Sequence, residues 1–168
     1  MGNDIEINEV DMPPKSLLNG EIKSPVYMDA LKFELPSEEI IEIEGVVRNF
    51  FNSQPLWLLS IMINIISKGK LEKSLVKNNF SEGSKVGHWK VTRSDNTEIV
   101  FGESLGFIEH RLSFCKVSND KNEFMTMSSV KTHNRFGVFY FYFVKLVHMK
   151  LVKFAIKNMY EKKYKGAI

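Results

Sequence analysis

The chain has 168 residues, 43% of them hydrophobic and 26% charged, and its 23 basic and 20 acidic residues give a formal net charge of +3. This size and balance predict one compact globular domain with a hydrophobic core, and they leave little room for a second domain. The basic excess lies mainly in the last thirty residues. It therefore marks a local basic face rather than a basic protein, and we expect no nucleic-acid partner.

The cysteine content and the apolar runs bear on location. Cys115 is the only cysteine and has no internal disulfide partner, which fits a reducing compartment. The acidic N-terminal residues lack the apolar stretch of a secretory signal, so we expect a cytoplasmic protein. The apolar run 56–66 is too short to span a bilayer, and lysines interrupt the run 136–155. The sequence therefore predicts no membrane span.

The N-terminal part divides into an arm and the start of the domain. Residues 1–25 are polar and contain prolines, which predicts an arm that packs loosely or not at all. We assign residues 26–168 to a single domain. Apolar residues alternate over 27–35, with Tyr27 and Asp29 on the same side as the leucines and Phe33, and this alternation predicts the first strand.

Two helices are expected next. Ser37 is a suitable N-cap for a helix over 38–51, whose apolar residues recur at helical spacing. Pro55 fits the first turn of a second helix, which continues to about Lys68 because Gly69 follows.

The periodicity then changes to two. Short polar turns separate four predicted strands, so an antiparallel meander is expected; the strands are 86–93, 97–104, 107–117 and 123–133. A long helix over 136–161 follows. The order of elements predicts an α+β fold of the helix-grip type, in which a curved antiparallel sheet wraps around the long C-terminal helix. Such folds commonly leave an apolar cavity between sheet and helix, where a small molecule can bind.

Two histidines are expected to face this interior. At 100° per residue, His148 falls on the apolar face of the last helix with Phe141, while Lys150, Lys153 and Lys157 lie on the opposite side. His148 is then either a polar group of a binding cavity or a buried histidine satisfied by the backbone. His110 shares one face of the strand 107–117 with Ile108, Leu112 and Phe114, and we expect it to face the same interior.

Other chemistry has weaker signals. His133 and Asn134 lie where the last strand meets the last helix, and Asn134 suits either a ligand contact or the helix N-cap. The histidines, Cys115 and nearby acids lack metal-ligand spacing, so we predict no metal or cofactor. The run 102–106 matches Gly-x-Ser-x-Gly, but a strand follows where a nucleophile elbow needs a helix. The lysine face is either a solvated surface or one that contacts a membrane or nucleic acid.

Several blocks of the sequence point to one family. They are Tyr27-Met28-Asp29-Ala30, Pro55-Leu56-Trp57, Gly102-Glu103, and His133-Asn134-Arg135-Phe136-Gly137 followed by Tyr140, His148, Leu151 and Val152. Residues 27–156 resemble a bacterial family of unknown function, number 2867 in the domain-of-unknown-function series. The family reads like Asp-Arg-His-Leu-Asp-Phe where this chain has residues 109–114, Glu-His-Arg-Leu-Ser-Phe. The resemblance implies a START-like, Bet v 1-like helix-grip fold more than a function.

Three functions follow as hypotheses. The first is the binding of a small hydrophobic molecule or lipid in the cavity between sheet and helix, with contacts from His148, Asn134, His133, His110, Phe141, Tyr140 and Trp57. The second is a cyclase-like or dehydratase-like enzyme that uses His148 as acid or base in the same cavity. The third is a protein-interaction module acting through the lysine face or the N-terminal arm. The sequence does not assign an oligomeric state.

Overall fold

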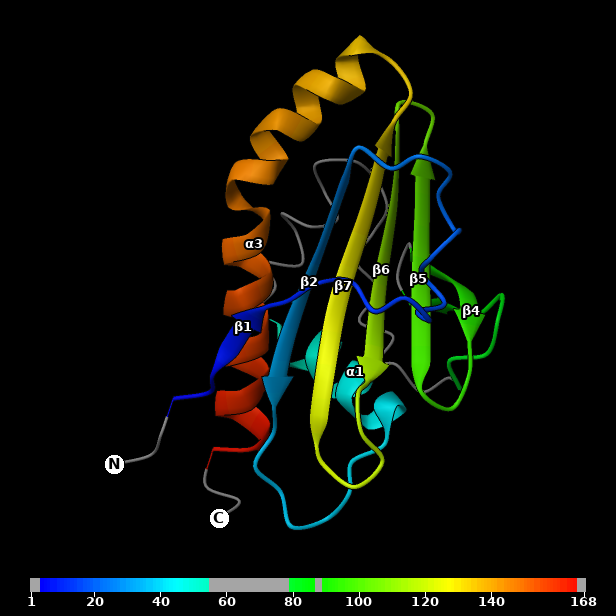
Figure 1. Cartoon of the computed structure of the whole chain (residues 1–168). Coiled ribbons are helices and arrows are strands. Elements are labelled where there is room, and N and C mark those ends of the chain that lie inside the picture. The colour runs from blue at the N-terminus through cyan, green and yellow to red at the C-terminus, as the bar shows by residue number, and fades with distance from the viewer. Residues whose placement is uncertain (1–3, 55–78, 87–88, 166–168) are drawn as a thin grey trace.

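The computed structural model describes residues 4–54, 79–86 and 89–165. The predicted second helix and Trp57 lie outside the described residues. Within the described ranges the chain is an α+β fold, in which the helices lie on one face of a curved antiparallel sheet and a long C-terminal helix runs along it (Figure 1). This arrangement agrees with the predicted helix grip.

The described residues form one seven-stranded sheet in the order β1-β2-β7-β6-β5-β4-β3, and every neighbouring pair is antiparallel. The meander β4 to β7 is confirmed, although the predicted strand 86–93 is wrong in detail because Val86 belongs to a separate short strand that pairs with β4. The strands are β1 (Ile7–Glu9), β2 (Tyr27–Glu34), β3 (Lys85–Val86), β4 (Trp89–Ser94), β5 (Glu98–Leu105), β6 (Ile108–Lys116) and β7 (Glu123–Thr132).

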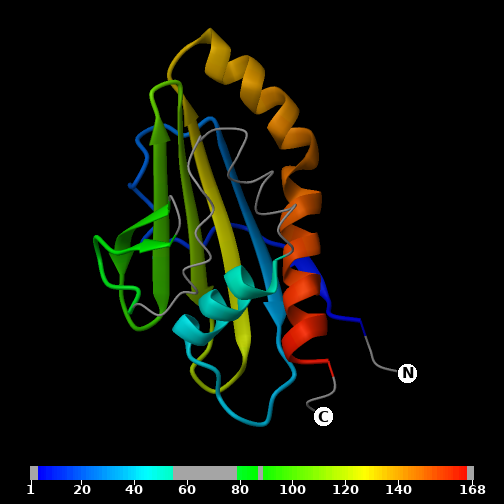
Figure 2. The same ribbon diagram turned by 180° about the vertical axis from the view of Figure 1, so that it is seen from behind.

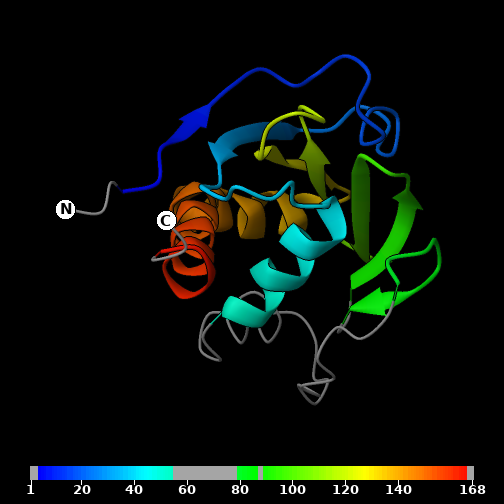
Figure 3. The ribbon, with the colours of Figure 1, turned by 90° about the horizontal axis from the view of Figure 1, so that it is seen from below.

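The N-terminal arm is part of the fold, so the prediction of loose packing is wrong. β1 pairs with β2, and Leu18 is 1% exposed where it packs on the outer face of the sheet. The buried Glu98 carboxylate on that face accepts hydrogen bonds from Ser16 Oγ and Leu17 N, both at 2.7 Å, and from Ser113 Oγ. The arm therefore covers apolar surface of the sheet opposite the helices (Figure 3).

Helix α1 (Ile43–Ser53) begins five residues after the predicted start at position 38, and Ser37 does not cap it. The Asn122 side chain explains the difference, because its Nδ2 donates to the carbonyls of Ser37 and Glu39 and its Oδ1 accepts from Ile41 N at 2.7 Å. Backbone groups that would enter a first helical turn are bound to this distant loop instead. The helix starts only beyond them.

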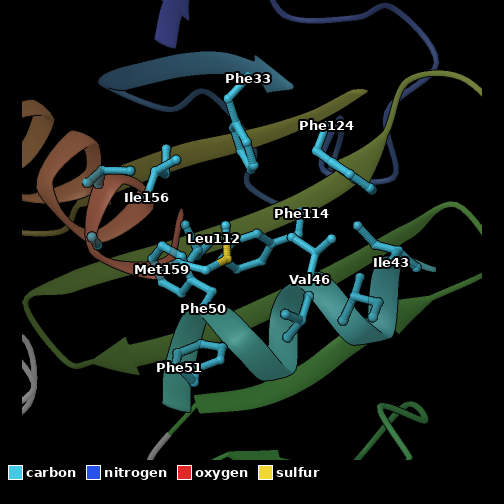
Figure 4. Packing of buried hydrophobic residues seen from close by; sticks show 14 of the residues in the cluster. Phe33, Ile43, Val46, Phe50, Phe51, Leu112, Phe114, Phe124, Ile156 and Met159 are labelled. Carbon is cyan, nitrogen blue, oxygen red and sulfur yellow. The ribbon is translucent and has the colours of Figure 1, made fainter. Parts of the chain in front are cut away.

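Helix α3 (Arg135–Lys163) matches the predicted long helix to within two residues. It shares the helix-bearing face of the sheet with α1, which crosses beside its C-terminal half (Figure 2). Phe50 of α1 meets Phe114 of β6 with 4.8 Å between ring centroids, and Met159 of α3 packs into the same core (Figure 4). Burying an aromatic side chain such as Phe50 contributes about 2–3 kcal/mol, so this cluster holds the helices to the sheet.

Candidate functional site

A cavity of about 130 Å³ lies between the sheet and the middle of α3, from Tyr140 to Ala155. Its wall is mostly apolar, and the described residues contribute polar groups to it from two histidines, a tyrosine, a glutamate and a tryptophan. The described residues that line it are Phe50, Trp89, Glu103, Leu105, Ile108, His110, Leu112, Val130, Tyr140, Phe141, Val144, Val147, His148, Leu151, Val152 and Ala155. The volume is close to the roughly 150 Å³ of a protein cavity that takes up benzene.

His148 projects from α3 towards β2 and β7, which are neighbours on the β1 side of the sheet. Asp29 of β2 and Ser128 of β7 stand directly opposite each other in the antiparallel register. His148 Nε2 lies 3.1 Å from Ser128 Oγ and 3.2 Å from Asp29 Oδ2. The cross-strand pair therefore fixes the imidazole at the cavity wall.

The carboxyl group of Asp29 responds to this contact. Burial alone would raise its pKa, but hydrogen bonding and charge from His148, with hydrogen bonds from Tyr27 and Ser128, bring the pKa below its ordinary value. Burial and the neighbouring Asp29 carboxylate raise the pKa of the Tyr27 hydroxyl. Asp29 is thus held as the anion and Tyr27 as the neutral phenol.

His110 reaches the same cavity from β6. Its ring centroid is 5.9 Å from that of His148 and 5.0 Å from that of Trp89, in edge-to-face arrangements. The alternation of β6 is as predicted: Leu112 faces the cavity, while Ser113 binds Glu98 on the outer face. The prediction that both histidines face one interior is confirmed.

The other predicted site residues occupy different places. Tyr140 and Phe141 line the cavity. Asn134 is the N-cap of α3, where its side-chain oxygen accepts from Gly137 N at 2.9 Å. His133 is exposed, with Nε2 3.5 Å from Glu109 Oε2. Among the described residues these two do not line the cavity, because the corner that holds them lies beyond its end.

Sequence reasoning did not select Asp29 or Trp89 for the site. Asp29 has a signal, since the alternation over 27–35 already placed a carboxylate on the inward side of the strand, where a charge needs a partner. Trp89 has none, because nothing near it in sequence indicates that β4 brings it beside His110.

Two features are absent from residues 4–54, 79–86 and 89–165. No three His, Cys, Asp or Glu side chains gather there as metal ligands would. No helix in the described part of the chain has both the length and the hydrophobicity that crossing a bilayer requires.

The fold and the cavity define an α+β domain that closes a curved antiparallel sheet against a long helix. A family model described as "Protein of unknown function (DUF2867)" matches residues 22–155, and the chain belongs to this family. No curated protein and no solved structure matches the chain significantly.

Proposed function

We propose that this protein binds a small, largely apolar molecule bearing one hydrogen-bonding group in the cavity between the sheet and α3. The observation that carries the proposal is the pair His110 and His148, set 5.9 Å apart in an otherwise mostly apolar wall. Apolar walls with a few placed polar groups are typical of small-molecule sites. The helix-grip arrangement supports the same function. The resemblance to START-like proteins that the sequence implies supports it as well.

The cavity size limits the ligand. About 130 Å³ accommodates a group of the size of one aromatic ring or a short branched chain. His148 is anchored through Nε2 to Asp29 and Ser128, so the hydrogen-bonding atom left for a ligand is its other ring nitrogen, Nδ1. A phenol-like molecule combines the required size with a single polar group.

The test compares phenol with toluene by calorimetry and ligand-observed NMR, and native mass spectrometry of the purified protein looks for a retained ligand. Val144→Phe should abolish binding because Val144 lines the cavity and the larger ring fills it. Val138→Phe is the matched control, since the same change on the same helix falls on a side chain that is 58% exposed.

The outcome has two readings. Binding of phenol that is lost in Val144→Phe and kept in Val138→Phe supports the proposal. His148→Gln should then weaken phenol by roughly fivefold, the worth of one hydrogen bond, and leave toluene unchanged. If neither probe binds and no ligand is retained in native mass spectra, the cavity is a packing defect and the proposal fails.

A second function, acid–base catalysis in the same cavity, has one specific observation in its favour. A carboxylate beside a histidine orients the imidazole for proton transfer, and Asp29 Oδ2 lies 3.2 Å from His148 Nε2. The molecule identified by native mass spectrometry would be incubated with the protein and with His148→Gln. Conversion by the wild type alone supports an enzyme, whereas release of the unchanged molecule by both supports binding only.

A further inference from the structure

The outward face of α3 carries an exposed apolar surface that neither the core nor the cavity uses. Its N-terminal half presents five large side chains at spacings of three, three, one and three residues, each between 53% and 64% exposed. We name this surface the aromatic stripe: Phe136, Phe139, Tyr142, Phe143 and Leu146. Stacking within it is edge-to-face, with 4.9 Å between the rings of Phe139 and Phe143.

The aromatic stripe and the face of α3 that packs on the core are two different faces of the helix. Phe141, His148 and Val152 lie on the opposite side and already pack on the sheet and cavity. At more than half exposure of each side chain, the stripe amounts to about 500 Å² of apolar surface, which is in the upper part of the range for the largest apolar patch on a monomeric protein. Surfaces of this size mark contact with a partner or a membrane.

The charges around the stripe distinguish a membrane from a protein partner. From Arg135 to Tyr160, α3 carries five cations and no carboxylate, and the first acid on the helix is Glu161. Two of the five, Lys153 and Lys157, pair with Glu9 and Asp4 of the N-terminal arm, so the cations near the stripe are Arg135, Lys145 and Lys150. Lys150 continues the same helix face directly below the stripe. Lys145 lies on the side of the helix between the stripe and the sheet, with Nζ 5.3 Å from the centroid of the Tyr27 ring. A helix that combines exposed aromatic residues with lysines and lacks acids is suited to the surface of an anionic bilayer.

We infer that the aromatic stripe docks this protein onto membranes that contain anionic lipids, with the N-terminal half of α3 lying in the interface. A second copy of the chain fits less well, because pairing the two stripes would bring together two cationic helix segments with no carboxylate between them. Val147 is half exposed beside the stripe and also lines the cavity. In the docked protein this part of the cavity wall would therefore contact the lipid. Docking itself requires no ligand in the cavity.

The test is co-sedimentation of the full chain with vesicles of phosphatidylcholine alone or with about one third phosphatidylglycerol. We expect binding to the mixed vesicles to exceed binding to the neutral ones several-fold and to fall as salt rises, because screening weakens the attraction. Phe139→Ser with Phe143→Ser should reduce binding at least tenfold. Ile40→Ser with Val117→Ser is the control, since both residues are exposed but lie outside α3.

Charge reversal tests whether the lysines near the stripe contribute to binding anionic lipids. Lys145→Glu with Lys150→Glu should weaken binding to the mixed vesicles by roughly fivefold for each cation lost. Lys85→Glu with Lys121→Glu changes the net charge equally on other elements and should have little effect. Circular dichroism of each variant checks that it is folded.

Two results overturn the inference. One is the absence of vesicle binding by the folded wild type. The other is a dimer in light scattering that dissociates in the Phe139 and Phe143 variant while vesicle binding is absent or unaffected, which would assign the stripe to a second copy. Phenol binding in the cavity is measured without lipid, so failure of either proposal is recognised separately.

Discussion

The close approach of Gly137 to the β5–β6 turn makes a prediction of definite sign. A Cβ added at Gly137 would lie 2.1 Å from the carbonyl oxygen of Phe107, a contact that must open to at least 3.0 Å. The same oxygen accepts from His133 N at 2.9 Å, so moving it disturbs the strand-to-helix corner. Gly137→Ala therefore cannot be accommodated by a side-chain rotation.

The size of the effect follows from three contributions. Overpacking against backbone costs about 1–3 kcal/mol, and weakening the His133–Phe107 hydrogen bond costs about 1 kcal/mol. Alanine is the better helix former by up to about 1 kcal/mol, which offsets part of this loss. We expect a net destabilisation of about 2 kcal/mol, seen as a fall in Tm of about 4–8 °C for a chain of this length.

The assay is urea unfolding followed by circular dichroism, with ΔG compared at a common slope. Gly45→Ala is the matched control, because an added Cβ there meets Ile41 Cγ2 at 3.6 Å, an ordinary contact, inside α1. That variant should be as stable as the wild type or slightly more stable. A Gly137→Ala protein that unfolds at or above the wild-type midpoint would refute the reasoning, since only the clash reverses the helix preference.

Three further predictions concern single groups. Asn134→Ala should cost about 1 kcal/mol through loss of the α3 cap, while Asn134→Ser keeps most of it, as judged by urea midpoints; equal losses would deny the cap. Asp29 has a lowered pKa when folded, so its stabilisation is present above about pH 4 and lost as pH falls through that folded pKa. The stability difference between wild type and Asp29→Asn should accordingly shrink below about pH 4, and a constant difference down to pH 2 would contradict this. Glu98→Ala should speed tryptic cleavage after Lys15 roughly tenfold by releasing the arm, whereas Glu98→Gln should do so less; unchanged cleavage in Glu98→Ala would mean that other contacts hold the arm.

The features that the sequence predicted correctly are those that depend on local periodicity. The alternation of β6 placed His110 and Leu112 inward and Ser113 outward, because the side-chain period of a strand admits only that division. Helical spacing likewise placed His148 inward on α3. Both assignments needed only neighbours on the same element.

The features that the sequence did not predict depend on contacts between distant residues. Ser16 reaches Glu98 across 82 positions, and Asn122 reaches Ile41 across 81. The first contact holds the arm on the outer face of the sheet, and the second delays the start of α1. Nothing in the local pattern of the arm or of residues 37–42 reveals a partner so far along the chain, so propensity alone gave a loose arm and an early helix.

The N-terminal half of α3 takes its orientation from polar residues further along the same helix. Apolar residues surround the helix there: Phe141 and Val144 are on one side, and Phe139 and Phe143 are on the other. Composition cannot say which side is buried. The choice is made further along the helix, where one face carries His148, which needs the Asp29 carboxylate, and the opposite face carries the exposed Lys150. A helix is rigid over these turns, so the inward position of His148 and the outward position of Lys150 also fix the orientation of the aromatic half. The face with Phe139 and Phe143 therefore lies on the outside.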